Sequence, residues 1–311
     1  MIVATILLAG CLSFASGLAP SEIPSFFIDT VVALGQNISP APGQPPQWRT
    51  EASGFLYGYA IDSETDMTKH NYQPYLVTNR HVFTGRTSIS VKINADQESM
   101  PTREFVMNLT DEHGVSLIVS HPDPSVDVSV IKMNGPFLRS QHLKVEFFAN
   151  DKHVADRAKM KDLGTSIGDG LFVLGFPMGI SGTLVRDYVI ARRGSIARIS
   201  DVLDGSSKTF LIDAFVFPGN SGGPVVSAVD ITAIEGTKPQ TTAYLIGMVK
   251  GYLPYDEVAV SQQTGRPRMV SEENSGLAEV IPVDFINETI EFDRRLHAQL
   301  PSPPAVPHVQ E

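Results

Sequence analysis

The stretch Phe217-Pro218-Gly219-Asn220-Ser221-Gly222-Gly223-Pro224-Val225-Val226 places one serine among three glycines, with a proline on each side. Glycine adopts backbone angles that are closed to other residues and lets another part of the backbone approach closely. Such a loop can present one hydroxyl outward while its own N–H groups converge on one point. Acyl transfer needs this arrangement, because an oxygen attacks and nearby donors stabilise the negative charge that develops on the substrate. Taken alone, the stretch also fits a glycine-rich turn between two strands.

A serine nucleophile needs a base, and the base needs an orienting group. Among the eight histidines of the chain, His81 directly follows an apolar run, and Asp127 lies inside an alternating apolar stretch. An imidazole can accept and return a proton near neutral pH, and a carboxylate can hold its tautomer. The order His81, Asp127, Ser221 is that of the chymotrypsin-like triad. Each residue alone also fits a structural role: a solvent-facing His81, a turn-capping Asp127 and a structural Ser221.

Three segments together resemble the catalytic domain of the chymotrypsin-like serine peptidases, and most of all its bacterial HtrA (Deg) type. These segments are Thr78-Asn79-Arg80-His81-Val82, Asp127-Val128-Ser129-Val130-Ile131 and Gly219-Asn220-Ser221-Gly222-Gly223-Pro224. The resemblance covers roughly residues 23–300. It implies that His81 is the general base, that Asp127 orients it and that Ser221 is the nucleophile. The backbone N–H groups of Gly219 and Ser221 would form the oxyanion hole.

Short apolar segments separated by turn residues predict an all-β fold. The resemblance implies two six-stranded antiparallel barrels of the chymotrypsin-like type, with the triad in the cleft between them. Residues 26–34 are expected to form a first strand, residues 252–273 a long flexible loop, and residues 284–300 a closing amphipathic helix. The proline-rich residues 301–311 are expected to be a disordered tail. HtrA proteins usually continue into a peptide-binding PDZ domain, which is not expected here because only this tail follows.

The composition excludes several other classes of protein. A net charge of −10, without a basic block, argues against nucleic-acid binding and against an anionic membrane surface. The single cysteine, Cys11, excludes an internal disulfide. The remaining histidines have neither cysteine partners nor the spacing of metal ligands, so no metal and no cofactor are expected.

Residues 1–19 carry no charged side chain and predict an export signal, although the usual basic residue near the start is missing. Within this segment, Leu8-Ala9-Gly10-Cys11 resembles a bacterial lipobox, in which Cys11 would be acylated. Lipidation with a membrane tether, plain cleavage and an uncleaved anchor all stay open. We expect an exported protein in the periplasm or outside the cell.

The sequence thus predicts a serine endopeptidase that acts on exported or unfolded polypeptides. A binding or scaffold protein on the same fold, without turnover, is the alternative. The spacing Gly219-x-Ser221-x-Gly223 also fits the nucleophile elbow of α/β-hydrolases, but that fold places its histidine after the serine. Only His297 and His308 follow Ser221, near the end of the expected helix and in the tail.

The resemblance also suggests a pocket for the side chain that precedes the cut bond. Phe215, six residues before the nucleophile, would form its floor, and its walls would come from Lys250, Gly251, Tyr252 and Gly276. Phe215 offers no charge to pair with a basic side chain, and burying an unpaired charge is costly. We therefore expect cleavage after small or medium apolar residues such as Val, Ala or Leu.

Overall fold

The computed structural model describes residues 22–299, except residues 40, 42, 63, 183–184 and 233–234. The expected export signal, Cys11 and the expected tail at 301–311 lie outside the described residues. No described helix is both long and apolar enough to cross a membrane.

The first half of the chain forms a curled sheet. Its strands are β1 (Val31–Ile38), β2 (Gln47–Ala60), β3 (Tyr72–Thr78), β4 (Ser88–Ile93), β5 (Arg103–Asn108), β6 (Ile118–Ser120), β7 (Ser129–Lys132) and β8 (Phe148–Ala149). They are arranged in the order β5-β4-β1-β2-β3-β7-β6, and β8 adds to β2 in parallel. The edge strands β5 and β6 approach each other only through a bridge between Thr110 and Ser116. The sheet therefore curls without closing, which differs from the expected six-stranded barrel, because β6 is too short to extend this pairing.

The second half forms a closed antiparallel barrel, as expected. Its strands are β9 (Gly170–Gly175), β10 (Ile190–Arg198), β11 (Phe210–Asp213), β12 (Pro224–Ser227), β13 (Leu245–Val260) and β14 (Pro267–Pro282). They close in the order β10-β11-β14-β13-β12-β9. Alternate residues of these strands fill the barrel, among them Leu171, Val173, Ile212, Val225 and Val280.

The helices are short except for the last one. They are α1 (Ser25–Asp29), α2 (Arg80–Phe83), α3 (Gly135–Ser140), α4 (Arg157–Leu163), α5 (Ser200–Leu203) and α6 (Val283–Gln299), with 3-10 turns η1 (Met67–Lys69) and η2 (Pro177–Gly179). The expected closing helix is thus present as α6. Its buried side chains Phe285, Ile286 and Ile290 belong to a core that also includes Phe55 and Tyr57 of the curled sheet and Leu245 and Met248 of the barrel. This shared core holds the two sheets together.

Residues 26–34 do not form a single strand. The segment starts as α1, which follows Pro24 and directs Phe27 into the core, and β1 begins only at Val31. Thr30 marks the change, since its hydroxyl donates a 2.7 Å hydrogen bond to the Phe27 carbonyl.

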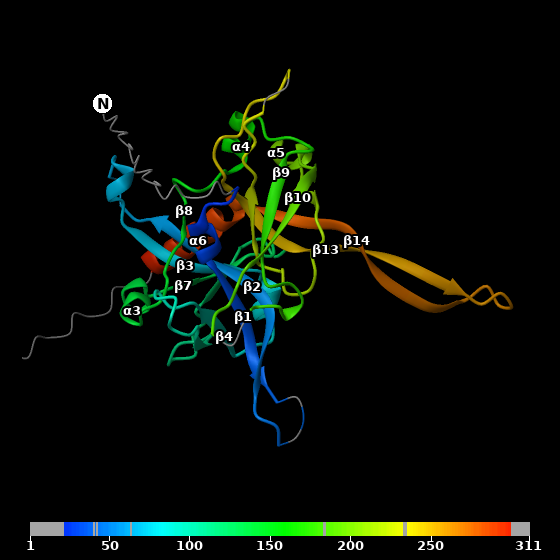
Figure 1. The fold of residues 1–311 in the computed structure, drawn as a ribbon, viewed down its shortest axis with the longest axis horizontal. Coiled ribbons are helices and arrows are strands. Elements are labelled where there is room, and N and C mark those ends of the chain that lie inside the picture. Colours follow the sequence, from blue (N-terminus) through cyan, green and yellow to red (C-terminus); the bar gives the residue numbers. More distant parts are fainter. Residues whose placement is uncertain are drawn as a thin grey trace, which may run out of the picture.

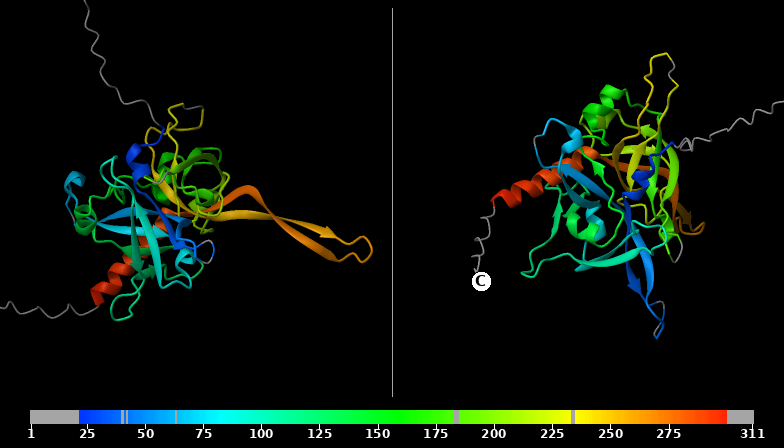
Figure 2. Two further views of the ribbon diagram at one scale, coloured as in Figure 1. Left: turned by 60° about the horizontal axis from the view of Figure 1, so that its bottom comes forward. Right: turned by 60° about the vertical axis from the view of Figure 1, so that its left-hand side comes forward.

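The largest difference from the sequence prediction lies at residues 252–273, which are not a flexible loop. Strands β13 and β14 continue beyond the barrel and pair with each other as far as Val260 and Pro267. Figure 1 and the left view of Figure 2 show this two-stranded ribbon projecting from the barrel. We call it the arm and define it as residues 253–274. Its side chains are almost all exposed, so no alternation of apolar and polar residues marked it in the sequence.

Candidate active site

His81 and Asp127 form a directed pair on the curled sheet. The Nδ1 atom of His81 lies 2.6 Å from Oδ2 of Asp127, and the backbone N–H of His81 donates to Oδ1 of the same carboxylate at 3.0 Å. A carboxylate can only accept hydrogen bonds, so Nδ1 carries the proton in this contact. In the neutral ring Nε2 is then the basic nitrogen. The His81 side chain is 51% exposed, which leaves that nitrogen within reach of a ligand.

Local sequence explains how these two side chains meet. His81 lies on α2, one turn after β3, and the buried neighbours Val82 and Phe83 anchor this turn. Asp127 stands between Val126 and Val128, which are both buried, so the alternation turns its carboxylate out of the core. The side-chain amide of Asn79 adds a 2.9 Å hydrogen bond to the Asp127 carbonyl, which fixes the two segments to each other.

Ser221 lies in a tight loop between β11 and β12. Asn220 is fully buried there, and its Oδ1 atom accepts a 3.1 Å hydrogen bond from the Phe217 N–H. Gly219 has φ = 100°, and a Cβ atom at this position would lie 2.3 Å from the Phe176 carbonyl oxygen. Gly222 has φ = 80°, and a Cβ there would lie 2.1 Å from Oγ1 of Thr78. The glycines are thus required both by their backbone angles and by close neighbours.

The structure brings Ser221 and His81 to the same cavity but does not join them by a hydrogen bond. This cavity, of about 270 Å³, is lined by both residues together with Pro218 and Gly219. The Ser221 hydroxyl donates instead to the Lys250 carbonyl at 3.4 Å. Only the His81–Asp127 half of the predicted triad is therefore formed. Catalytic hydrogen bonds are often long or misaligned without substrate, so the free conformation does not exclude the third member.

The backbone around Ser221 leaves two N–H groups free. The carbonyl of Pro218 accepts from Met178 at 2.7 Å, and the carbonyl of Gly219 accepts from Oγ of Ser53 at 2.7 Å. The Pro218 carbonyl and the Gly219 N–H belong to one trans peptide group and point in opposite directions. Because the carbonyl points toward Met178 of η2, the Gly219 N–H points away from η2. Within the described part of the chain, the N–H groups of Gly219 and Ser221 have no hydrogen-bond acceptor. Both predicted oxyanion-hole donors are thus unoccupied.

A second cavity, of about 310 Å³, opens on the other side of Ser221. It is lined by Ser221, by residues of the preceding loop and by the base of the arm: Val216, Phe217, Pro218, Gly251, Tyr252, Pro254 and Glu272. Gly251 and Tyr252, two of the residues predicted for a substrate pocket, thus line a cavity together with Ser221. Glu272, whose carboxylate accepts a 2.7 Å hydrogen bond from the Tyr252 hydroxyl, was missed because its position depends on the pairing of β13 with β14.

The other three residues assigned to a substrate pocket do not line this cavity. Phe215 is 59% exposed and stacks on Phe217, with ring centroids 6.4 Å apart. The ammonium group of Lys250 lies 2.8 Å from a carboxylate oxygen of Glu279 on β14. Gly276 has φ = 83° near the base of the arm.

A third cavity, of about 490 Å³, lies beside β2. Its lining includes Trp48, Arg49 and Met178, and it shares Pro218 and Gly219 with the cavity of His81 and Ser221. The cavity of His81 and Ser221 lies between the other two in its lining, since it also shares Pro218 and Ser221 with the cavity at the base of the arm.

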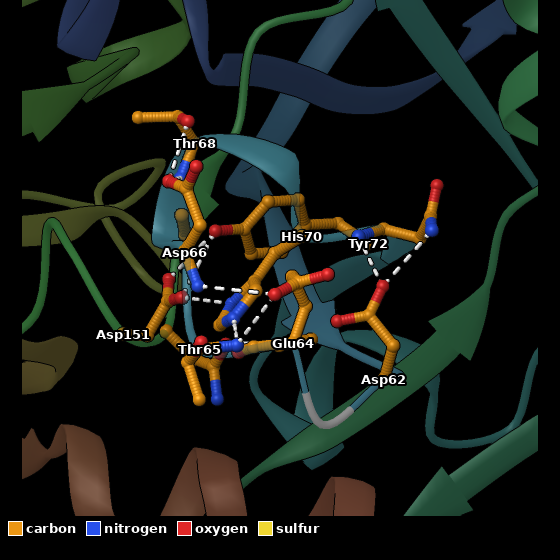
Figure 3. A network of polar contacts seen from close by, with 12 residues as sticks. Asp62, Glu64, Thr65, Asp66, Thr68, His70, Tyr72 and Asp151 are labelled. Carbon is orange, nitrogen blue, oxygen red and sulfur yellow. Dashed lines mark hydrogen bonds and ion pairs between the residues drawn. The ribbon is translucent and has the colours of Figure 1, made fainter.

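A second histidine–aspartate pair lies on the far side of the curled sheet, in the network of Figure 3. Nδ1 of His70 is 2.6 Å from Oδ2 of Asp151, and Nε2 is 2.5 Å from the Glu64 carbonyl oxygen. The hydrogen bond to Glu64, and then the contact with Asp151, raise the pKa of His70. Both ring nitrogens are engaged, so this pair fixes the loop before β3. Among the described residues, no group of three or more His, Cys, Asp or Glu side chains is placed to hold a metal ion.

Comparisons with known proteins agree with this geometry. Residues 52–230, more than half of the chain, match the family model described as the trypsin-like peptidase domain. The chain therefore belongs to the trypsin-like peptidase domain family. A search of curated proteins found no match.

Two solved structures are similar to this chain at low identity. The protease domain of MamO from Magnetospirillum magneticum, in its apo form, is 16% identical; the match covers 85% of this chain and 96% of that chain, with a TM-score of 0.42. The HtrA-type protease AlgW with a decapeptide is 17% identical; the match covers 88% of this chain and 65% of that chain, with a TM-score of 0.41.

Proposed function

We propose that the protein is a serine endopeptidase that hydrolyses peptide bonds of exported or unfolded polypeptides. The observation that carries this proposal is the directed His81–Asp127 pair, whose cavity also contains the Ser221 hydroxyl. Membership of the trypsin-like family supports it. The architecture we propose is a double barrel in which the curled sheet takes the place of the first barrel.

In the proposed reaction, Ser221 first turns from the Lys250 carbonyl toward His81. Nε2 of His81 removes the hydroxyl proton while Oγ attacks the carbonyl carbon of the substrate. The N–H groups of Gly219 and Ser221 stabilise the oxyanion, and His81 then returns the proton to the leaving amine. Water, activated by the same histidine, hydrolyses the acyl-enzyme and restores Ser221. Asp127 holds the ring and stabilises the imidazolium throughout.

A binding protein without turnover is the second candidate, and one observation favours it. The Ser221 hydroxyl donates to the Lys250 carbonyl, so the resting chain lacks the hydrogen bond that would activate the nucleophile. A fluorophosphonate probe separates the candidates because it reacts only with an activated serine. Labelling that maps to Ser221 supports the peptidase. Complete absence of labelling, with the fold intact, supports the binding protein.

The proposals on location rest on residues 1–19 alone. An exported protein in the periplasm or outside the cell agrees with substrates that are exported or unfolded. Acylation of Cys11 would add a membrane tether.

A further inference from the structure

The arm begins at the proposed nucleophile. Beyond Val249, the edge of β13 that faces away from β14 pairs with no strand in the described part of the chain. This open edge starts at Lys250, whose carbonyl accepts from Ser221, and runs out along the arm to Val260. An exposed strand edge is a template on which an extended peptide can lie.

One face of the arm continues the cavity beside Ser221. The register pairs Pro254 with Asn274, Asp256 with Glu272 and Val258 with Val270, and alternation puts these pairs on one face. Pro254 and Glu272 line the cavity, so this face looks toward it. We call it the cavity face and define it as Pro254, Asp256, Val258, Val260, Arg268, Val270, Glu272 and Asn274. Its three valines are between 46% and 58% exposed.

The charges of the cavity face indicate what it binds. Asp256 stands directly opposite Glu272, and like charges in this position destabilise a sheet. Neither carboxylate forms an ion pair with another described residue; Glu272 accepts only from the Tyr252 hydroxyl. A cationic side chain bound between them would relieve the repulsion, and the adjacent valines would pack against the apolar part of the same chain.

We propose that the cavity face binds the part of the substrate polypeptide that precedes the cut bond, and that it favours Lys or Arg there. Antiparallel pairing is the more stable kind, and a substrate antiparallel to β13 has its N-terminal side toward the tip of the arm. Asp256 lies roughly 17 Å along β13 from Gly251 at the rise of a strand. In this alignment the substrate residue directly before the cut bond lies opposite Gly251. The residue opposite Asp256, where a cation is favoured, is then about the sixth before the cut bond. This inference rests on the proposed function and names a feature of its substrates.

Peptide binding to the full chain carrying Ser221→Ala tests the inference without requiring turnover. Three fluorescein-labelled peptides share the same six central residues. The first peptide consists of these six residues alone. The second is extended at its N-terminus and carries lysines around the sixth residue before the central bond. The third has the same extension with glutamates in place of the lysines. Fluorescence anisotropy gives the three dissociation constants at about 0.15 M salt.

We expect the lysine peptide to bind about fivefold more tightly than the glutamate peptide, a ratio typical of one exposed ion pair. Adding Asp256→Lys should abolish this preference, because the new ammonium group lies directly opposite Glu272 and neutralises the pair. The matched control is Glu257→Lys, the same charge change on the neighbouring residue, which points to the opposite face. It should leave the ratio within about twofold. Circular dichroism checks that both variants fold.

Equal binding of the lysine and glutamate peptides overturns the inference, and so does an equal effect of Asp256→Lys and Glu257→Lys. A change of sedimentation coefficient in Asp256→Lys, with the peptide preference unaltered, would instead assign the arm to a second copy of the chain. Failure of the proposed catalysis is seen separately, as absence of fluorophosphonate labelling in the chain that retains Ser221.

Discussion

The hydroxyl of Ser221 donates its hydrogen bond to the carbonyl of Lys250, 3.4 Å away, and not to His81. A serine side chain has three staggered rotamers, so rotation about its Cα–Cβ bond can redirect the hydroxyl. His81 is already held by Asp127 at two points. The proposed triad therefore requires at least a change of the Ser221 rotamer.

Ser221→Ala should abolish peptidase activity while the fold remains intact. Loss of the nucleophile in a comparable triad lowers kcat by about 10⁶-fold. The measurement is digestion of casein by the purified variant, with thermal unfolding as the check of the fold. Residual activity above a small percentage of the wild-type rate would show that another group attacks the substrate.

Asp127→Asn should lower kcat by about 10⁴-fold, with a much smaller change in KM. The amide can donate where the carboxylate only accepts, so it holds the wrong tautomer of His81 and no longer stabilises the imidazolium. Initial rates with a fluorogenic peptide over a range of concentrations give both constants. Asp123→Asn is a suitable control, because Asp123 lies in the same loop and pairs with Lys208 instead. A loss below tenfold in Asp127→Asn would remove this residue from the triad.

Sequencing of the peptides released from denatured casein should show cuts after small or medium apolar residues. Phe215, the predicted floor of the pocket, lies outside the cavity beside Ser221, but Val216, Phe217 and Pro254 supply apolar walls there. Cuts that fall mainly after Lys or Arg would mean that the carboxylate of Glu272 dominates the cavity. In that case Glu272→Gln should lower the rate of these cuts selectively.

His70 should stabilise the fold most at acid pH. Its folded-state pKa is raised above the unfolded value of about 6.5, so the stabilisation is fully present below that value. It is lost as the pH rises through the folded-state pKa. The difference in Tm between wild type and His70→Gln should accordingly shrink from pH 5.5 to pH 9, while the exposed His113→Gln shows little difference at any pH. A difference that grows with pH would contradict the raised pKa.

Cys11 should carry lipid if Leu8-Ala9-Gly10-Cys11 is a lipobox. Metabolic labelling with palmitate in a bacterial host should then mark the wild type and not Cys11→Ser. A soluble mature protein whose first residue comes after Ala15 would rule out the lipid and leave plain secretion.

The parts of the fold that the sequence could predict are those that depend on local patterns. The alternation around Asp127 places its carboxylate outward, and the glycines around Ser221 encode a turn that only they can adopt. Individual strands of the second half and α6 follow from apolar periodicity in the same way, whereas the closed six-stranded barrel was implied by the family resemblance. These features need only neighbouring residues, so a single sequence contains them.

The parts that could not be predicted depend on distant pairing or on a single torsion. Gly265 and Pro267 mark a turn, but the arm around them is solvated on both faces and lacks the alternation that identifies a half-buried strand. The place of Glu272 beside Ser221 follows from its register with Asp256. The direction of the Ser221 hydroxyl is one rotamer among three, which no sequence pattern specifies.

Helix α6 also determines when the molecule can become complete during synthesis. The buried Tyr57 of β2 donates its hydroxyl to Oδ1 of Asn287 at 2.7 Å, and the buried Tyr75 of β3 donates to Oδ2 of Asp293 at 2.9 Å. The two hydrogen bonds join residues that are 230 and 218 positions apart in the sequence. Strands β2 and β3 are therefore synthesised long before the helix that supplies their hydrogen-bond acceptors. Until α6 has been synthesised, the curled sheet that positions His81 and Asp127 has two phenol groups and an apolar face uncovered. The surface that holds His81 and Asp127 is therefore complete only after residues 283–299 have been synthesised.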